Sequence, residues 1–281
     1  MKTTKAILIL CIAHCLTTSC KKEADMTLVQ KTVLENVDIW RVNVNHGWEA
    51  TVVYDSQKSF VELEYSAYLE DYVSVGESDE WLSIGFTSKI NALSGSVYKA
   101  TVHISRQDAL CLRADNASVI TLEGPFELEE TMDIELHNGS VCNGFAVSSH
   151  SCSIHLDYDS QLLGVDYNGG HCSVYAYKRS SCKGYFNVEQ NFTAEVGINS
   201  QLIVFGGAMP SASIELKEAG TINMVKAEVN DMYVYLDGAS EATVNVSETL
   251  SGFLLEGSTL YYKGHPQIDV DCSDDSQLIP F

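Results

Sequence analysis

The feature that most constrains this chain is a ten-residue period of apolar side chains through its middle. Counted in tens from Leu112 to Ala242, every position holds an apolar residue or a cysteine. From the third unit onward, the positions two and four residues further along are also apolar or glycine, except Asp166 and Lys226. Side chains in a strand alternate between two faces, so three positions separated by two form one inward face. Each unit therefore predicts a five-residue strand and a turn.

Residues that bend a chain readily stand just before these strands. They are Ser140, Ser160, Gly170, Ser180, Ser200, Gly220, Asn230 and Ser240. A fixed short period indicates stacked units, none of which buries its apolar face alone. Two all-β architectures fit: a parallel β-helix with two strands in each coil of about twenty residues, and an antiparallel meander with about ten residues per strand and turn.

The outward positions favour the β-helix, because their character repeats every twenty residues. One set of strands points apolar residues outward: Phe145, Leu163, Val165, Tyr185, Ile203, Phe205 and Val225. The alternate set points polar residues and tyrosines outward: Ser153, His155, Ser173, Tyr175, Thr193, Glu195, Ser213, Glu215, Tyr233 and Tyr235. Strands twenty residues apart that share one environment are neighbours in one sheet of a coil. The apolar stripe either binds a partner or lies under the amino-terminal segment.

The first residues form an export signal, in which Lys2 and Lys5 precede an apolar stretch too short to span a bilayer. Small polar residues then lead to Cys20, as in bacterial lipoprotein signals whose cysteine is acylated. We therefore expect a signal peptide over 1–19 and lipid at Cys20, with ordinary signal cleavage as the alternative. The protein would then contact a membrane only through this anchor.

Removal of residues 1–19 leaves 15 basic and 38 acidic side chains, a formal charge of −23. Nucleic acids and anionic lipid headgroups are bound through Lys and Arg, so this balance argues against both as direct ligands. A solvated acidic surface is the expected meaning, and cationic partners would be admitted.

Four cysteines, Cys142, Cys152, Cys172 and Cys182, occupy inward positions, where a thiol acts as a small buried hydrophobe. Zinc ligands usually stand two to four residues apart, so a spacing of ten or twenty predicts no metal site. Cys152 and Cys172 would be neighbours in the stack, at about 4.8 Å, which allows a disulfide.

Residues 31–281 read as a single β-helix domain that follows a lipid-anchored linker over 20–30. Within it we expect an irregular cap and first coils over 31–111, a regular ladder over 112–246 and closing coils over 247–281. A separate small domain at the amino-terminal end is the alternative. A short helix would fit the apolar face of Tyr65, Tyr68, Leu69 and Tyr72.

The segments LDGASEATVNVSETL and GSTLYYKGHP, near the end, resemble the closing coils of the putative auto-transporter adhesin, head GIN domain family. The stretch from NVDIWRVNVNHGW to WLSIGF resembles that family's opening. The resemblance covers about residues 30–281 and is firmest over 232–266. It implies a right-handed parallel β-helix in an exported Bacteroidetes protein, on the outer membrane at the cell surface or the periplasmic face. It brings no catalytic or ligand residues.

Two sets of outward residues are candidate sites. Exposed tyrosines suit a sugar face or a protein partner, because rings give contact area with little entropy to lose. The candidates are Tyr175, Tyr177, Tyr185, Tyr233 and Tyr235, with Tyr167 at a strand edge. A polysaccharide-processing enzyme would need a base or paired carboxylates, for which the candidates are His155, Asp157, Asp159 and Asp166.

The sequence thus favours a non-catalytic binding or adhesion protein of the cell envelope, with no cofactor. The expected partner is a surface glycan or an envelope or host protein. A polysaccharide lyase or hydrolase is the alternative, and a structural envelope component is the third hypothesis.

Overall fold

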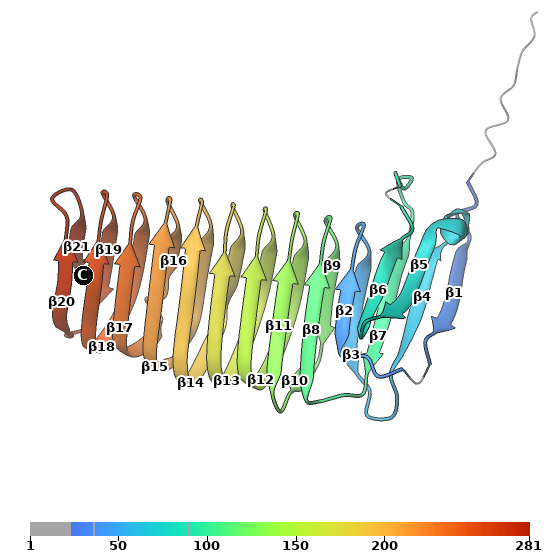
Figure 1. Cartoon of the computed structure of the whole chain (residues 1–281), viewed down its shortest axis with the longest axis horizontal. Coiled ribbons are helices and arrows are strands. Elements are labelled where there is room, and N and C mark those ends of the chain that lie inside the picture. Colours follow the sequence, from blue (N-terminus) through green and yellow to red (C-terminus); the bar gives the residue numbers. More distant parts are fainter. Residues whose placement is uncertain (1–23, 36, 89) are drawn as a thin grey trace, which may run out of the picture.

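The computed structural model describes residues 24–281, apart from 36 and 89. Within these residues the chain forms 21 strands and one 3-10 helix. Most strands pair in parallel and stack into an elongated solenoid (Figure 1). In the regular part, register partners lie 20 residues apart, as Met132 and Cys152 do. The predicted all-β parallel coils are confirmed, and the antiparallel meander is wrong.

The amino-terminal third contains seven strands and the helix. Their bounds are β1 (Leu28–Val33), β2 (Arg41–Val44), β3 (Glu49–Tyr54), β4 (Phe60–Ser66), η1 (Ala67–Tyr72), β5 (Val73–Ser78), β6 (Trp81–Phe86) and β7 (Tyr98–Ile104). The helix lies where the sequence allowed one.

The remaining strands form the coils of the main stack. Their bounds are β8 (Ala109–Ala114), β9 (Val119–Glu123), β10 (Pro125–Glu127), β11 (Thr131–Leu136), β12 (Val141–Leu156), β13 (Gln161–Ala176), β14 (Ser181–Gly197), β15 (Gln201–Lys217), β16 (Thr221–Asn223), β17 (Ala227–Leu236), β18 (Glu241–Leu254), β19 (Thr259–Lys263), β20 (Gln267–Cys272) and β21 (Gln277–Pro280).

The strands form two walls, which we call sheet A and sheet B. Sheet A contains β6, β2, β8, β11, the carboxyl-terminal halves of β12 to β15, β17, the second half of β18, and β20. Sheet B contains β7, β3, β9, the amino-terminal halves of β12 to β15, β16, the first half of β18, β19 and β21. Long strands such as β13 continue from sheet B into sheet A.

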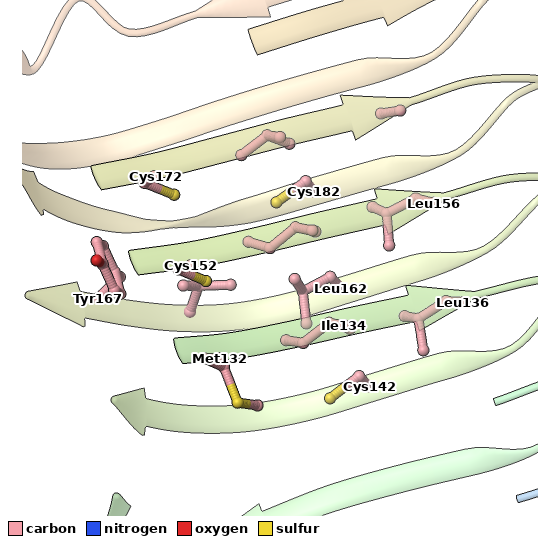
Figure 2. Close-up of a cluster of buried hydrophobic side chains, with 14 of the residues drawn as sticks. Met132, Ile134, Leu136, Cys142, Cys152, Leu156, Leu162, Tyr167, Cys172 and Cys182 are labelled. Carbon is pink, nitrogen blue, oxygen red and sulfur yellow. The ribbon is translucent and has the colours of Figure 1, made fainter. Parts of the chain in front are cut away.

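The core lies between the two sheets, where the inward columns meet. Met132, Ile134 and Leu136 point from β11 toward Cys142 and Leu162 on the other wall (Figure 2), and all five are fully buried. Because each coil buries its apolar face against its neighbours, the stack forms one continuous hydrophobic core.

Tight turns join sheet A to sheet B along one edge of the stack. Most of them have two consecutive residues with positive φ, the backbone of a type I′ turn. Examples are Asn138 (53°) with Gly139 (75°), and Tyr158 (50°) with Asp159 (63°). A buried serine often follows, and the Ser160 hydroxyl donates to the Asp157 carbonyl at 2.6 Å. The hydroxyls of Ser118, Ser240 and Ser258 donate in the same way, whereas those of Ser140 and Ser180 have no hydrogen-bond partner.

Coil length changes along the stack, so the ten-residue count drifts at both ends. Leu112 pairs with Ile134, 22 residues away, rather than with Met132. Beyond β17 the coils shorten to 18 residues, as the pairing of Leu250 with Ile268 shows. These two changes keep the inward positions, because each is an even number of residues.

The two exceptions in the inward columns have local causes. At Gly164 the φ angle is +77°, and a bulge shifts the register. Beyond it Val165 is buried and Asp166 is exposed, so the predicted outward position of Val165 is wrong. Lys226 lies exposed in a turn between β16 and β17. Phe145 was also predicted to point outward, but its side chain lies outside the described residues.

At the amino-terminal end, the coils do not stack in chain order. Strand β2 lies between β6 and β8 in sheet A, and β3 lies between β7 and β9 in sheet B. Strand β4 pairs antiparallel with β7, β1 pairs antiparallel with β4, and β5 pairs antiparallel with β6. This end of the solenoid is therefore closed by antiparallel strands and η1 (Figure 1).

Candidate binding surface

The outer face of sheet A carries a row of side chains in which each coil contributes one. Pairing in register aligns His155, Tyr175, Glu195, Glu215, Tyr235 and Phe253. At one end, the rings of His155 and Tyr175 stack with centroids 4.5 Å apart and an interplanar angle of 11°. His155 therefore covers one face of the Tyr175 ring, and the other face is turned toward the coil of Glu195.

The middle of the row is acidic. Lys217 forms an ion pair with Glu215, and its Nζ also lies 4.0 Å from a Glu195 carboxylate oxygen. Tyr177 stands beside this pair, with its ring against Gly197. Burial, and then the nearby Glu195 carboxylate, raises the pKa of Tyr177 well above its usual range. Tyr177 thus stays a neutral hydroxyl at any physiological pH.

Three aromatic rings gather at the far end of the row. Tyr233 is 43% exposed and Phe253 is 42% exposed, whereas Tyr235 is half-buried. Tyr235 and Phe253 are register partners on β17 and β18, and Tyr233 is on the same face of β17. Phe253 was not among the sequence candidates, because the 18-residue coil moves it out of the ten-residue count.

Sheet B carries a separate aromatic pair. Tyr185 is 53% exposed, and its ring centroid lies 5.7 Å from that of Phe205. The Tyr185 ring rests against Gly206, which has no side chain to displace it. The described part of the amino-terminal segment stacks on the end of the solenoid (Figure 1), and Tyr185 and Phe205 remain exposed to solvent. The interpretation that it covers the apolar stripe is therefore wrong for that part of the chain.

Tyr167 is not a surface residue, contrary to its predicted place at a strand edge. Its side chain is fully buried, and its hydroxyl lies 2.8 Å from the His171 carbonyl and 3.1 Å from the Ser149 carbonyl. The bulge at Gly164 turns this ring inward.

The structure does not bring the four acid and base candidates together. The Asp157 carboxylate lies 3.1 Å from Lys178 Nζ, and Asp159 accepts two hydrogen bonds from Arg179, at 2.6 and 2.7 Å. The Arg179 guanidinium lowers the pKa of Asp159. Asp166 is on the sheet B half of β13, whereas His155 is on sheet A. Two of the carboxylates are thus held in ion pairs at the turn edge.

The buried cysteines lie where the sequence placed them. Cys152 and Cys172 are register partners in sheet A, and both are free thiols (Figure 2). Cys142 and Cys182 point inward from sheet B. Burial raises the pKa of the Cys142 thiol to about 12, and burial and the adjacent Cys152 thiol raise that of Cys172. The predicted disulfide stays a prediction.

A cluster of tryptophans and arginines at the amino-terminal end of sheet A is absent from the sequence candidates. The guanidinium of Arg41 lies 4.0 Å from the Trp40 ring centroid and 5.7 Å from that of Trp81. Arg106 lies 5.1 Å from Trp40, and Arg113 lies 5.1 Å from Trp81. Three of the chain's four arginines thus lie against two of its three tryptophans, and the adjacency of Trp40 and Arg41 was the one sign of this cluster in the sequence.

In the part of the chain that the structure describes, no helix is long and apolar enough to cross a membrane. In the same residues, no group of three or more His, Cys, Asp or Glu side chains could hold a metal ion. Cys20, the predicted lipidation site, lies outside the described residues.

The profile of the family described as putative auto-transporter adhesin, head GIN domain, matches residues 40–266. The chain belongs to this family. The resemblance seen in the sequence is thus confirmed, and the match includes both candidate surfaces. No curated protein matches the chain significantly.

Solved structures from two Parabacteroides species share this fold. A putative lipid binding protein of Parabacteroides distasonis superposes with a TM-score of 0.65 and 12% identity, over 92% of this chain and 98% of that one. A putative adhesin of the same species gives 0.59 and 14%, over 92% and 96%. A putative adhesin of Parabacteroides merdae gives 0.57 and 13%, over 92% and 98%. At these identities the likeness shows the fold alone.

Proposed function

We propose that this family member is a non-catalytic binding or adhesion protein of the cell envelope, displayed on the outer membrane through lipid at Cys20. The observation that carries the proposal is the exposure of aromatic rings on a rigid stack, with Tyr233 and Phe253 on sheet A and Tyr185 and Phe205 on sheet B. Large rings left in solvent are costly unless they meet a partner, and they lose little entropy when they do.

The comparisons support this proposal. The family is described as a putative auto-transporter adhesin, and two of the similar structures are those of putative adhesins. A third is that of a putative lipid binding protein. The ligand that the exposed rings suit is a surface glycan or the face of an envelope or host protein.

The alternative, a polysaccharide-processing enzyme, is less consistent with the site. A general acid or nucleophile must reach the substrate, but Asp157 and Asp159 are each paired with a cation on the next coil. Asp166 lies on the sheet B half of β13, away from the turn edge that holds Asp157 and Asp159, so the three cannot act together on one bond.

Single substitutions separate the two functions. In the full chain, Tyr175→Ala, Tyr185→Ala and Tyr233→Ala are compared with Asp157→Asn and Asp159→Asn, and adhesion to bacterial and host surface material is measured. A binding protein shows graded loss in one or more tyrosine variants and little change in the aspartate variants. Complete loss of a measured polysaccharide conversion in one aspartate variant would establish the enzyme instead.

The anchor is tested separately by Cys20→Ala. We expect the protein to move from the membrane fraction to the soluble exported fraction, because the lipid is the proposed attachment. Unchanged membrane fractionation of the variant would refute lipidation at this residue, while leaving the binding proposal intact.

A further inference from the structure

We infer that the ligand of the outer face of sheet A is a neutral, linear glycan that lies along the long axis of the solenoid. This inference rests on the proposed binding function and names its site. The site is the row of Tyr175, Glu195, Glu215 and Tyr235, with His155 before it and Phe253 after it.

The spacing of the side chains in the row matches the spacing of sugars in a linear glycan. Each coil adds one side chain, and neighbouring parallel strands are about 4.8 Å apart. Tyr175 and Tyr235 are separated by three coil steps, or about 14 Å on that spacing. An extended polysaccharide also repeats one unit along its length, with a unit length close to one coil step. A glycan along the axis can thus place equivalent sugars over successive coils.

The side chains of the row are also of the kinds that bind sugars, namely aromatic rings and hydrogen-bond acceptors. At the β17–β18 end of the row, the exposed rings of Tyr233 and Phe253 can pack against the apolar faces of sugars. At the other end, Tyr175, whose ring is stacked on His155, offers its edge and its hydroxyl. The carboxylates of Glu195 and Glu215 between them accept hydrogen bonds from hydroxyls, and charged acceptors form the stronger bonds. Beside them runs a row of smaller hydroxyls, in which Thr193 Oγ1 donates to Ser173 Oγ at 2.8 Å. Rings at the ends and acceptors in the middle match a chain of several sugars.

Charge decides which glycan fits. Lys217 is the cation beside Glu195 and Glu215, and it is shared between them. The middle of the row therefore keeps a net negative charge, within a chain of formal charge −21. Uronic acids or sulfated sugars would be repelled there. Neutral sugars meet no such repulsion.

The same segment argues against a protein partner at this site. The cores of protein interfaces are depleted in charged residues and rich in aromatic ones. Here the centre of the row is carboxylates and hydroxyls, whereas the rings stand at its ends. That order is the reverse of an interface with a buried apolar centre.

The test is a length series. Binding of the full chain to neutral β-linked glucan, mannan and xylan oligosaccharides of two to eight units is measured by titration calorimetry. An oligosaccharide of two units can contact only one of the two aromatic ends of the row, whereas one of four or more units can contact both. We expect affinity for at least one series to rise about tenfold or more between two and five units and then to level off. Tyr235→Ala should remove this rise, and Tyr185→Ala on sheet B should leave it unchanged.

Two results would overturn the inference. If oligosaccharides bind but Tyr185→Ala abolishes binding and Tyr175→Ala and Tyr235→Ala do not, the glycan site is on sheet B and the proposed function survives. If no oligosaccharide of any length binds, the row is not a neutral glycan site. In that case, retained adhesion to envelope or host protein leaves the proposed function standing, and loss of all adhesion removes it too. Melting temperatures of the variants confirm that each is folded.

Discussion

At the scale of single residues, two glycines decide how the middle coils depart from the repeat. Gly164, with its positive φ, makes the bulge that turns Tyr167 into the core. Gly169 then leaves room at the corner for the Tyr167 hydroxyl, which hydrogen-bonds two backbone carbonyls. The pattern of ten could not reveal this, because a bulge changes the inward phase without changing the repeat length.

Gly169→Ala should destabilise the protein. A Cβ at this position would lie 1.9 Å from the Ser149 carbonyl oxygen and 2.5 Å from the Tyr167 hydroxyl. Overpacking of this kind costs about 1–3 kcal/mol, so we expect the thermal midpoint to fall by several degrees. Gly76→Ala is the matched control, since its Cβ would meet nothing within 4 Å. Equal midpoints for the two variants would contradict the close-packed corner.

A second prediction at this scale concerns Cys152 and Cys172. We propose that they form a disulfide in the exported protein, because their strands are register neighbours and an oxidising compartment favours the bond. The two thiols would pass two hydrogens to a disulfide-bearing oxidase, which is reduced to its dithiol. Burial raises the pKa of the Cys172 thiol and suppresses its thiolate, so the bond must form before the coils close.

Mass spectrometry of the exported protein, alkylated under denaturing conditions without reduction, checks the bond. We expect a peptide pair joined through Cys152 and Cys172, with Cys142 alkylated. Alkylation of both Cys152 and Cys172 would show that they act only as small core residues.

At the scale of elements, the departure from chain order at the amino-terminal end is the main result that sequence could not supply. Strand β2 pairs with residues 40 and 70 positions further along, in β6 and β8. Sequence periodicity does not reveal such pairings, because the segments that separate β2 from β6 and from β8 differ in length and in their turns. The regular coils were predictable, since one pattern of inward residues repeats there. What holds β2 between its partners is partly the cluster of tryptophans and arginines.

Arg41→Ala should therefore weaken this end of the solenoid. Arg41, on β2, lies against Trp40 and against Trp81 of β6, and Arg113 of β8 covers the same Trp81. Each cation–π contact is worth about 0.5–2 kcal/mol, so we expect a loss of about 1–2 kcal/mol and a change in tryptophan fluorescence before global unfolding. Arg179→Ala, which breaks an exposed ion pair at a turn, is the control and should cost less than about 1 kcal/mol. A larger effect from the control would mean that the cluster does not bind β2 in place.

At the scale of the whole molecule, the solenoid turns a repeated sequence into two long, rigid faces. Sequence periodicity predicted which side chains point outward on sheet A, and the structure places Tyr175, Glu195, Glu215 and Tyr235 in one row. It could not predict that His155 stacks on Tyr175, or that the carboxylates of Asp157 and Asp159 are paired across coils. Those contacts depend on rotamers, which a pattern of inward and outward positions leaves open.

The most direct test of the account is a glycan-array screen of the full chain in detergent, run beside a long incubation of each bound glycan to detect released products. The account claims binding without chemical conversion, so it predicts reproducible binding to neutral glycans and no products. Release of shortened or unsaturated sugars would contradict it and direct attention to His155, Asp157 and Asp159.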